Sequence, residues 1–329
     1  MIITVTPNPS IDRTVMLDRP LERGGVHRLS PPVDAAGGKG VNVARVLRRA
    51  GVDPLVILPA PEGSKLVRTI EAEGMRVART PSSEVRTNLT LTEIDGTTTK
   101  LNEPGPELSP EELRELEQLI AARTEVATSG PRRGWVVLAG SLPRGVAPDW
   151  YLRMTARLRL RGVRVAVDTS DEPIRAFAEA EVLPDLLKPN GAELAMLTGN
   201  ATGTGRQLEA AAEAGDFEPV LAAAKGLHRR GCGAVLVTLG AAGALLYTDD
   251  QAWVASPPPI TPRSTVGAGD SSLAGYLLGV LADKSPADRL RLAVASGSAA
   301  ASLPGTGVPS PDQFDLEHTQ VRSLRSCIA

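Results

Sequence analysis

The sequence predicts an α/β protein in which a doubly wound, mostly parallel sheet is flanked by helices and carries a small β-sheet lid. Over most of the 329 residues, short apolar strands alternate with amphipathic helices. Parallel sheets joined by right-handed helical crossovers have this pattern. Residues 12–35 and 86–102 break the rhythm, because strand-like alternation continues there without helices. We expect these two stretches to form one lid sheet, inserted in a single domain that spans residues 1–329.

Apolar runs and periodicity place the individual elements. The expected strands of the main sheet lie at residues 1–6, 55–58, 76–79, 135–139, 163–167, 186–187, 234–238 and 244–247. The expected helices lie at residues 64–73, 110–127, 149–161, 269–282 and 287–302, with two more after the turns at 37–40 and 190. Alternation at Val15, Leu17, Val26 and Leu29 indicates short lid strands. Residues 200–215, rich in Ala, Gly and Glu, predict a mobile surface insertion or an extra short helix.

Composition and charge indicate a small-molecule partner. The chain has 36 basic and 38 acidic residues and no basic run, which disfavours nucleic-acid and membrane-surface binding. No apolar run approaches the ~20 residues that span a bilayer, and the N-terminus lacks the basic segment of a signal peptide. Cys232 and Cys327 are not in a metal-ligand spacing. We therefore expect a cytoplasmic protein with neither a disulfide framework nor a zinc site.

Residues 264–271, STVGAGDS, place a carboxylate at the start of a helix. Gly267 and Gly269 allow positive φ angles and leave amide N–H groups uncovered, while the helix N-terminus adds a partial positive charge. The result is an anion cradle that contains Asp270. Phosphoryl transfer needs such a cradle for developing charge and a base for the acceptor hydroxyl. Asp270 is the candidate base, and a plain helix-capping aspartate is the alternative interpretation.

A second glycine-rich turn, GGKG at residues 37–40, leads into an amphipathic helix. Its spacing is not that of a Walker A loop, so a nucleotide P-loop is not supported. Lys39 among bare backbone amides can still bind a phosphate or a sugar hydroxyl, and Asn42 lies at the same end of the helix. The alternative is a packed turn that carries a solvated lysine.

Polar residues follow several strands on the side where doubly wound sheets bind ligands: Asp12, Ser141, Asp168, Lys188 and Asn190. For Asp12 the alternative interpretation is an ordinary turn aspartate. Asn190 and Glu193 share one face of a helix start, where their oxygens could orient Mg²⁺ through water. A capping box explains the same pair. Arg86, at the mouth of the lid, is either a phosphate clamp or a solvated edge-strand arginine.

Seven stretches in order resemble the signatures of the ribokinase-like carbohydrate kinases of the PfkB family. They lie at residues 6–12, 37–47, 102–106, 140–143, 188–193, 238–240 and 264–276, and so cover nearly the whole chain. The resemblance implies a ribokinase-like fold, ATP and Mg²⁺ as cofactors, and a homodimer formed through the lid sheets.

The resemblance also implies roles for individual residues. Asp270 would be the base, and the backbone of Gly267, Ala268 and Gly269 would stabilise the transferred phosphoryl group. Sugar recognition would fall to Asp12, Gly38, Lys39 and Asn42, and the phosphate already on the substrate would be held by Arg28, Lys39 and Arg86. The nucleotide would lie by Lys188, Asn190, Thr238, Gly240, Gly243, Gly267 and Gly269, and the metal by Asn190 and Glu193. The insertion at 200–215 departs from the family pattern near the nucleotide contacts, and Ala300 stands where relatives often have an asparagine.

Within the family, Lys39 and the NEPGP segment at 102–106 favour a kinase that converts D-fructose 1-phosphate to D-fructose 1,6-bisphosphate. Kinases of tagatose 6-phosphate and of fructose 6-phosphate are the alternatives. A non-catalytic sugar-phosphate sensor is a minor alternative, because such a protein should have lost Asp270 or its glycines. A Rossmann-type oxidoreductase would need a GxGxxG motif after the first strand, where residues 8–12 contain no glycine.

Overall fold

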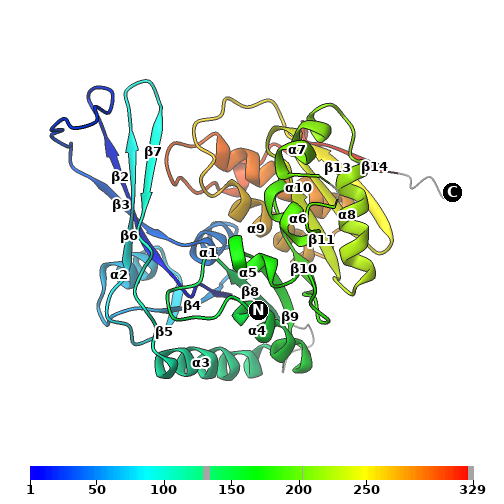
Figure 1. Ribbon diagram of the computed structural model, residues 1–329, viewed down its shortest axis with the longest axis horizontal. Coiled ribbons are helices and arrows are strands. Elements are labelled where there is room, and N and C mark those ends of the chain that lie inside the picture. The colour runs from blue at the N-terminus through cyan, green and yellow to red at the C-terminus, as the bar shows by residue number, and fades with distance from the viewer. Residues whose placement is uncertain (129–133, 202, 325–329) are drawn as a thin grey trace.

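The computed structural model, which describes residues 1–128, 134–201 and 203–324, contains two separate sheets (Figure 1). The large sheet has ten strands in the order β14-β13-β12-β11-β10-β9-β8-β1-β4-β5. Its strands are β1 (Ile2–Val5), β4 (Leu55–Pro59), β5 (Arg76–Thr80), β8 (Trp135–Ala139), β9 (Arg164–Asp168), β10 (Leu186–Leu187), β11 (Ala234–Thr238), β12 (Ala244–Thr248), β13 (Gln251–Ser256) and β14 (Gln320–Leu324). The seven strands from β11 to β5 are parallel, and β12, β13 and β14 extend them in antiparallel fashion. The predicted doubly wound, mostly parallel sheet is therefore confirmed.

Helices cover both faces of this sheet. They are α1 (Lys39–Arg49), α2 (Lys65–Ala72), α3 (Pro110–Thr128), α4 (Trp150–Leu160), α5 (Asp171–Arg175), α6 (Gly191–Leu197), α7 (Gly205–Glu213), α8 (Glu218–Arg229), α9 (Ala268–Leu281) and α10 (Pro286–Ala301). Side chains of the strands alternate between two apolar cores. Val136 and Leu138 of β8 pack with residues of α3, α4 and α8, whereas Val137 packs with residues of α1, α9 and α10. Burial on both faces explains why the strands read as continuous apolar runs.

The small sheet is the predicted lid, and it stands apart from the large sheet on the left of Figure 1. Its strands are β2 (Ser10–Met16), β3 (Val33–Gly37), β6 (Arg86–Thr92) and β7 (Thr98–Asn102), in the order β3-β2-β6-β7. The chain passes from the end of β1 into β2 through residues 6–9 only. Because β2 runs parallel to β6, Asp12 lies beside Asn88. The lid is thus attached directly to the carboxyl edge of the large sheet.

The prediction of strands around Val26 and Leu29 is wrong. Both residues lie in the loop that joins β2 to β3, and they are 79% and 53% exposed. Apolar alternation produces a strand only where a partner strand and a buried face are available, and this loop has neither in the described part of the chain. Val15 and Leu17, in contrast, are buried with Leu91 of β6.

Four further elements, α7, α8, β13 and β14, show what the pattern left open or did not reveal. Residues 205–213 form helix α7, which Thr204 and Gln207 cap reciprocally, so the helical alternative for the 200–215 stretch is the observed one. Strands β13 and β14 and helix α8 had not been predicted. Strand β14 pairs with β13 across a separation of more than 60 residues, which no local pattern encodes.

Cys327 lies outside the described residues. None of the described helices has the length and apolarity needed to cross a membrane.

The order of the strands creates one crevice at the carboxyl edge. From β1 the chain moves to β4 and β5 on one side and later to β8 and β9 on the other. Ligands of open α/β sheets bind at such a reversal, because the loops diverge there. The turn at residues 37–40, the start of α1 and the lid all adjoin this point, since a Cβ at Gly140 would lie 4.0 Å from the amide nitrogen of Lys39.

Helices α9 and α10 pack at the closest approach that glycine allows. A Cβ at Gly275 would lie 2.2 Å from the Ser296 hydroxyl and 2.4 Å from the Leu292 carbonyl oxygen. The backbone carbonyl cannot move aside without shifting α10. This contact holds α9, and therefore its N-terminus, in place.

We predict that Gly275→Ala lowers the free energy of unfolding by about 1–3 kcal/mol, because the new methyl group overpacks the α9–α10 contact. Gly226→Ala in α8 is the matched control, since no heavy atom lies within 4 Å of its Cβ position. That change should stabilise the protein by about 0.5–1 kcal/mol through helix propensity. Urea denaturation of both variants makes the measurement. Equal stabilisation of the two would show that the helix contact is looser than described.

Candidate active site

Asp270 lies in the first turn of α9, at the crevice. The turn before it is left-handed at Gly267, with φ of 75°, which a glycine adopts at little cost. The first amide groups of a helix have no intrahelical acceptor, so this turn presents them to the crevice. Asp270 is 7% exposed, and the Asn42 amide nitrogen donates to its Oδ2 at 2.8 Å. Helices α1 and α9 thus bring together two residues that are 228 positions apart.

Burial raises the pKa of Asp270 to about 6, and the negative charge of Asp168 adds to this effect. The Lys39 ammonium group, the hydrogen bond from Asn42 and the Lys188 ammonium group act in the opposite direction. A carboxylate in this range is ionised near neutral pH and is more basic than an ordinary aspartate. These are the properties of a general base.

Asp168, at the end of β9, is fully buried and lies between two lysines. The Lys39 ammonium nitrogen is 2.8 Å from its Oδ1, and the Lys188 ammonium nitrogen is 3.1 Å from its Oδ2. Burial opposes ionisation of Asp168, but the two lysines outweigh burial and lower its pKa below the usual range. Burial likewise disfavours the charge on Lys39, and Asp168, Glu193 and Asp270 more than compensate by raising its pKa. Asp168, Lys39 and Lys188 form a charged cluster beside Asp270.

Asn190 and Glu193 form the capping box of α6. The Asn190 side-chain oxygen accepts from the Glu193 amide at 2.8 Å, and Glu193 Oε2 accepts from the Asn190 amide at 2.9 Å. Glu193 Oε1 is outside the box and lies 3.8 Å from the Lys39 ammonium nitrogen. Burial raises the pKa of Glu193. Among the described residues, no group of three or more acidic, histidine or cysteine side chains could hold a metal on its own.

Asn190 and Glu193 fit Mg²⁺ only as a hydrated ion, which they would contact through its waters. Mg²⁺ keeps several waters and is usually held by one or two carboxylates together with substrate phosphates. Glu193 Oε1 can accept from such a water, whereas the Asn190 oxygen is already engaged in the cap.

Asp12 and Arg86 face the crevice from the lid. Asp12 Oδ1 accepts from the Ser10 hydroxyl at 2.7 Å and from the Asn88 amide at 3.0 Å. A Cβ at Gly37 would lie 2.3 Å from the Asp12 carboxyl carbon, so only glycine fits opposite it. Arg86 donates to the Ser141 hydroxyl and to the Glu103 carbonyl oxygen. Its Nε and the Asn88 side-chain oxygen are buried without a partner in the described structure.

The predicted nucleotide residues continue along the carboxyl edge. Thr238, at the end of β11, forms a bridge with Asn190 and donates its amide to the Pro189 carbonyl oxygen at 3.0 Å. The turn that follows has positive φ angles at Gly240 and Gly243. A Cβ at Gly243 would lie 2.0 Å from the Ala255 carbonyl oxygen, whereas the Gly240 position is open. The turn therefore leaves its backbone at Gly240 accessible.

Arg28 is not joined to this arrangement. It is exposed in the loop between β2 and β3, and no contact connects it to another predicted site residue within the described part of the chain.

Sequence reasoning in turn assigned no role to Asn8 or Asn88. The Asn8 amide donates to Pro104, Ser141 and Leu142 and so ties the end of β1 to two loops. For Asn8, the signal in the sequence was an asparagine shortly after the first strand, at the edge where such sheets bind ligands.

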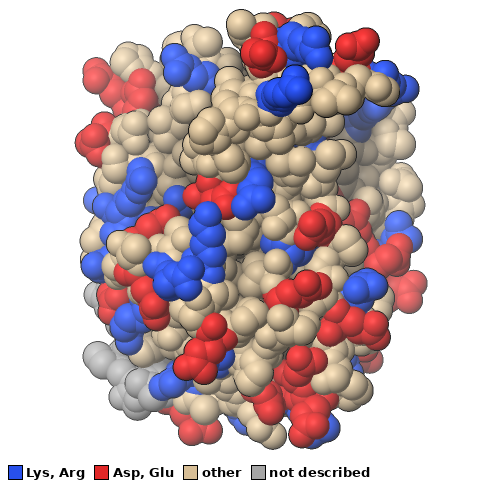
Figure 2. All heavy atoms as spheres, turned by 90° about the vertical axis from the view of Figure 1, so that its left-hand side faces the viewer, with Lys and Arg blue, Asp and Glu red and all other residues tan. Residues whose placement is uncertain are grey.

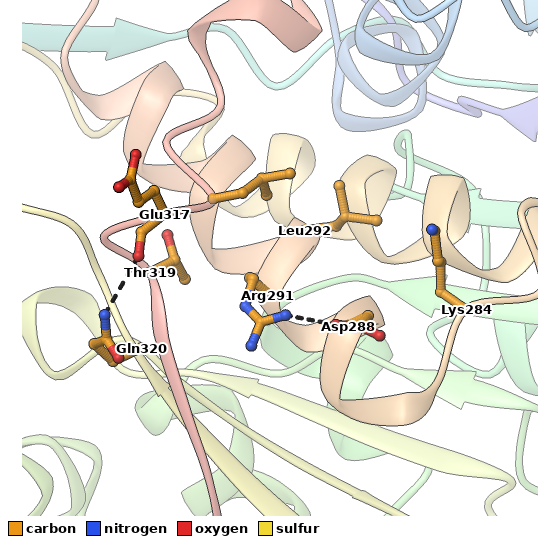
Figure 3. Close-up of a pocket in the computed structure, with 8 residues that line it drawn as sticks. Lys284, Asp288, Arg291, Leu292, Glu317, Thr319 and Gln320 are labelled. Atoms are coloured by element: carbon orange, nitrogen blue, oxygen red, sulfur yellow. Dashed lines mark hydrogen bonds and ion pairs between the residues drawn. The ribbon is translucent and has the colours of Figure 1, made fainter.

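A surface pocket lies at the other end of α9 (Figure 3). Its lining residues are Lys284, Asp288, Arg291, Leu292, Leu316, Glu317, Thr319 and Gln320. Arg291 donates to Asp288, and Gln320 donates to the Glu317 carbonyl oxygen. Because α9 ends at Leu281, its C-terminal end lies roughly 16 Å from Asp270 along the helix axis. The pocket is separate from the catalytic end of the helix.

Comparisons with known proteins agree with this geometry. The family model of the pfkB carbohydrate kinases matches residues 5–313. A 1-phosphofructokinase of Haloferax volcanii is 35% identical over 331 residues, which cover 99% of this chain and 100% of that protein. The 1-phosphofructokinase of Escherichia coli K12 is 32% identical over 316 residues, 95% of each chain.

A solved structure of phosphofructokinase-2 from Escherichia coli, in complex with substrates and products, is 30% identical to this chain. It superposes with a TM-score of 0.83 and covers 95% of this chain and 96% of its own. These matches extend over both sheets and over the motifs that form the site. The chain therefore belongs to the pfkB family of carbohydrate kinases, enzymes that transfer a phosphoryl group to an alcohol acceptor.

Proposed function

We propose that this kinase phosphorylates D-fructose 1-phosphate with ATP and Mg²⁺ to give D-fructose 1,6-bisphosphate and ADP. The observation that carries the proposal is the buried, basic carboxylate of Asp270 at the glycine-lined N-terminus of α9. The substrate is suggested by relatives named 1-phosphofructokinase, which are 32–36% identical over most of their length.

The transfer is direct. The acceptor hydroxyl oxygen forms a bond to the γ-phosphorus while the bond from that phosphorus to the β,γ-bridging oxygen breaks. The hydroxyl proton passes to Asp270, and ADP leaves with the bonding electrons. Asn42 holds Oδ2 of Asp270, which leaves Oδ1 for the hydroxyl. The backbone amides of Gly267, Ala268 and Gly269 stabilise the charge on the transferred group.

The lid supplies the acceptor site. Asp12 and Asn88 present polar atoms suited to sugar hydroxyls, and Gly38 and Asn42 bound the other side. Arg86 carries a buried Nε without a partner, which suits the phosphate already on the substrate. A guanidinium group binds phosphate in a bidentate manner.

The nucleotide occupies the opposite side, along Lys188, Asn190, Thr238, Gly240 and Gly243. The family resemblance implies ATP and a divalent metal as the cofactors of this kinase. When bound, Mg²⁺ neutralises charge on the phosphates, and Glu193 Oε1 is the protein oxygen that can accept from its water shell.

Fructose 6-phosphate is the second candidate substrate, with tagatose 6-phosphate beside it. The supporting observation is that phosphofructokinase-2 of Escherichia coli, solved in complex with fructose-6-phosphate, is 29% identical with a TM-score of 0.82.

We predict the highest kcat/KM with fructose 1-phosphate in a coupled ADP-release assay with magnesium-ATP. Fructose 6-phosphate, tagatose 6-phosphate and fructose are the comparison substrates, all at sub-saturating concentration. A preference for either 6-phosphate would reject the proposed substrate and keep the mechanism. Absence of turnover on all four would favour the sensor alternative.

Asp270→Asn should lower kcat by about 10³-fold or more, because the acceptor hydroxyl loses its base. The same change should raise the melting temperature at pH 8 and raise it less at pH 5. The reason is that the folded pKa of Asp270 lies above that of a free aspartate, so its ionised form destabilises the fold as pH rises through about 6. Turnover close to that of the wild type would exclude Asp270 as the base.

The pH profile of kcat/KM should show an acid limb near pH 6, since Asp270 acts only when it is deprotonated. Below that pH, activity should fall about tenfold per unit. The measurement is made with buffers of constant ionic strength between pH 5 and 9. Full activity at pH 5 would contradict the raised pKa.

The proposed function includes a homodimer formed through the lids. Exposed apolar side chains gather on the lid and its loops, among them Met16, Val26, Leu29, Val33, Ile94 and Leu101. In Figure 2, which faces this side of the molecule, uncharged surface separates the scattered charged side chains in the upper part. Such patches are typical of protein interfaces.

Light scattering should therefore give a dimer for the wild type and a monomer for the Val33→Asp, Leu101→Asp double variant. Charged groups at these positions would have to be desolvated in the interface. Leu160→Asp is the control, because Leu160 in α4 is 89% exposed and lies outside the lid. A monomeric wild type, or a double variant that stays dimeric, would reject the lid interface.

A further inference from the structure

The proposed mechanism assigns no role to Asn8, although this side chain contacts the same two loops as Arg86. Asn8 is 3% exposed, so it lies too deep to bind a ligand in the crevice itself. We propose that Asn8 is the residue that positions Arg86 for the phosphate already present on the sugar. The inference rests on the proposed function, because Arg86 is taken as the group that binds this phosphate.

Asn8 and Arg86 donate to the same oxygen. The distance from Asn8 Nδ2 to the Ser141 hydroxyl oxygen is 3.2 Å, and the distance from Arg86 Nη2 to that oxygen is also 3.2 Å. Asn8 Nδ2 lies 3.3 Å from the Leu142 carbonyl oxygen as well. Asn8 therefore binds two successive residues of the loop after β8. Supporting hydrogen bonds of this kind hold a ligand-binding side chain in place, and here they hold the acceptor of Arg86 Nη2.

The other terminal nitrogen of Arg86 depends on the loop after β7. Arg86 Nη1 donates to the Glu103 carbonyl oxygen at 3.0 Å, and Asn8 Nδ2 donates to the carbonyl oxygen of the next residue, Pro104, at 3.1 Å. Asn8 thus holds both loops to which the guanidinium group donates. Each terminal nitrogen carries two hydrogens, so the second hydrogen on each can bind an oxygen of a phosphate.

Gly105, in the loop after β7, brings the amide group of Asn8 against the stem of Arg86. A Cβ at Gly105 would lie 2.2 Å from Asn8 Oδ1 and 3.3 Å from Arg86 Cδ. Asn8 Oδ1 is buried and accepts no hydrogen bond within the described residues. The reverse orientation of the amide would direct this oxygen at three acceptor oxygens, so the hydrogens on Nδ2 determine the orientation. Loss of these hydrogens would release both loops.

A guanidinium group that is held in advance binds phosphate more tightly than a mobile one. An arginine side chain loses rotamer freedom when a ligand fixes it, and earlier fixation removes this cost from binding. The transfer does not alter the resident phosphate, so its contacts act in the ground state and in the transition state alike. Interactions of this kind affect substrate affinity and leave kcat nearly unchanged. Asn8 should therefore influence the Kd of the sugar phosphate.

The test uses Asn8→Ala, Arg86→Gln and the double variant, with the ketose phosphate that the wild type turns over fastest. Calorimetric titration of this sugar phosphate without nucleotide gives Kd, and the coupled assay gives kcat and the KM of ATP. Arg86→Gln should weaken Kd about tenfold or more, because hydrogen bonds to a charged group are lost. Asn8→Ala should weaken Kd about fivefold, with kcat and the KM of ATP within about twofold of the wild type.

Thr124→Val is the matched control, and it should leave Kd unchanged. The Thr124 hydroxyl is another buried donor to a backbone carbonyl, that of Ala121, in the last turns of α3, which leads into the amino end of β8.

The double variant tests the link between Asn8 and Arg86. Because Asn8 acts through Arg86, Asn8→Ala in the Arg86→Gln background should change Kd by less than about twofold. A purely structural role of Asn8 would weaken Kd in both backgrounds.

Ser141→Ala keeps the test decisive if Asn8→Ala does not fold. It removes the oxygen that Asn8 and Arg86 share, from a half-buried residue of a loop. This change should weaken Kd about threefold in the wild type and should have no effect in the Arg86→Gln background.

An Asn8→Ala variant with the Kd of the wild type would overturn the inference. Equal weakening of Kd by Asn8→Ala in both backgrounds would also overturn it, as would a Ser141→Ala variant with the Kd of the wild type. A wild type without turnover, or an Arg86→Gln variant with the Kd of the wild type, would instead reject the proposed function, so the two failures are distinguishable.

Discussion

The site depends on an imbalance of buried charge. Asp168, Glu193 and Asp270 are three carboxylates of at most 7% exposure at one edge of the sheet, and two ammonium groups lie among them. Both lysines form their shortest ion pairs with Asp168, and Asp168 therefore stays ionised. Burial raises the pKa of Asp270 to about 6, and the negative charge of Asp168 adds to this rise, which Lys39, Asn42 and Lys188 offset only in part. The position of one aspartate thus contributes to the basicity of another.

Close backbone contacts hold these charges where they are. Gly267 and Gly275 give α9 its entry turn and its contact with α10, and Gly37 makes room for Asp12 on the lid. The parallel pairing of β2 with β6 joins segments that are separated in the chain by four elements of the large sheet and its helices, α1, β4, α2 and β5. The proposed acceptor site is therefore formed by long-range pairing, while the proposed cradle for the transferred group is local.

The proposed acceptor and donor halves of the site also differ in burial. Asp270, Asp168 and Lys188 are buried on elements packed into the main cores. Arg86 and Asp12 lie on a four-stranded sheet whose own apolar cluster contains only Val15, Leu17 and Leu91 as buried members. Two other residues of this sheet, Ile11 and Ala36, are buried instead against residues of α1, α2 and β4.

Sequence alone determined the parts that rest on local pattern: the strand and helix alternation, the lid sheet and the glycine turns before α1 and α9. It also singled out Asp270, Lys39, Asn42, Arg86 and Glu193, because each follows a turn or strand end whose chemistry is readable within a few residues. Only the tertiary structure decided that Asp168 joins Lys39 to Lys188, that Asn42 meets Asp270 and that Arg28 stays outside. These outcomes depend on pairings between distant segments and on burial, which periodicity does not encode. Strand β14 shows the same limit, since its partner β13 lies more than 60 residues earlier.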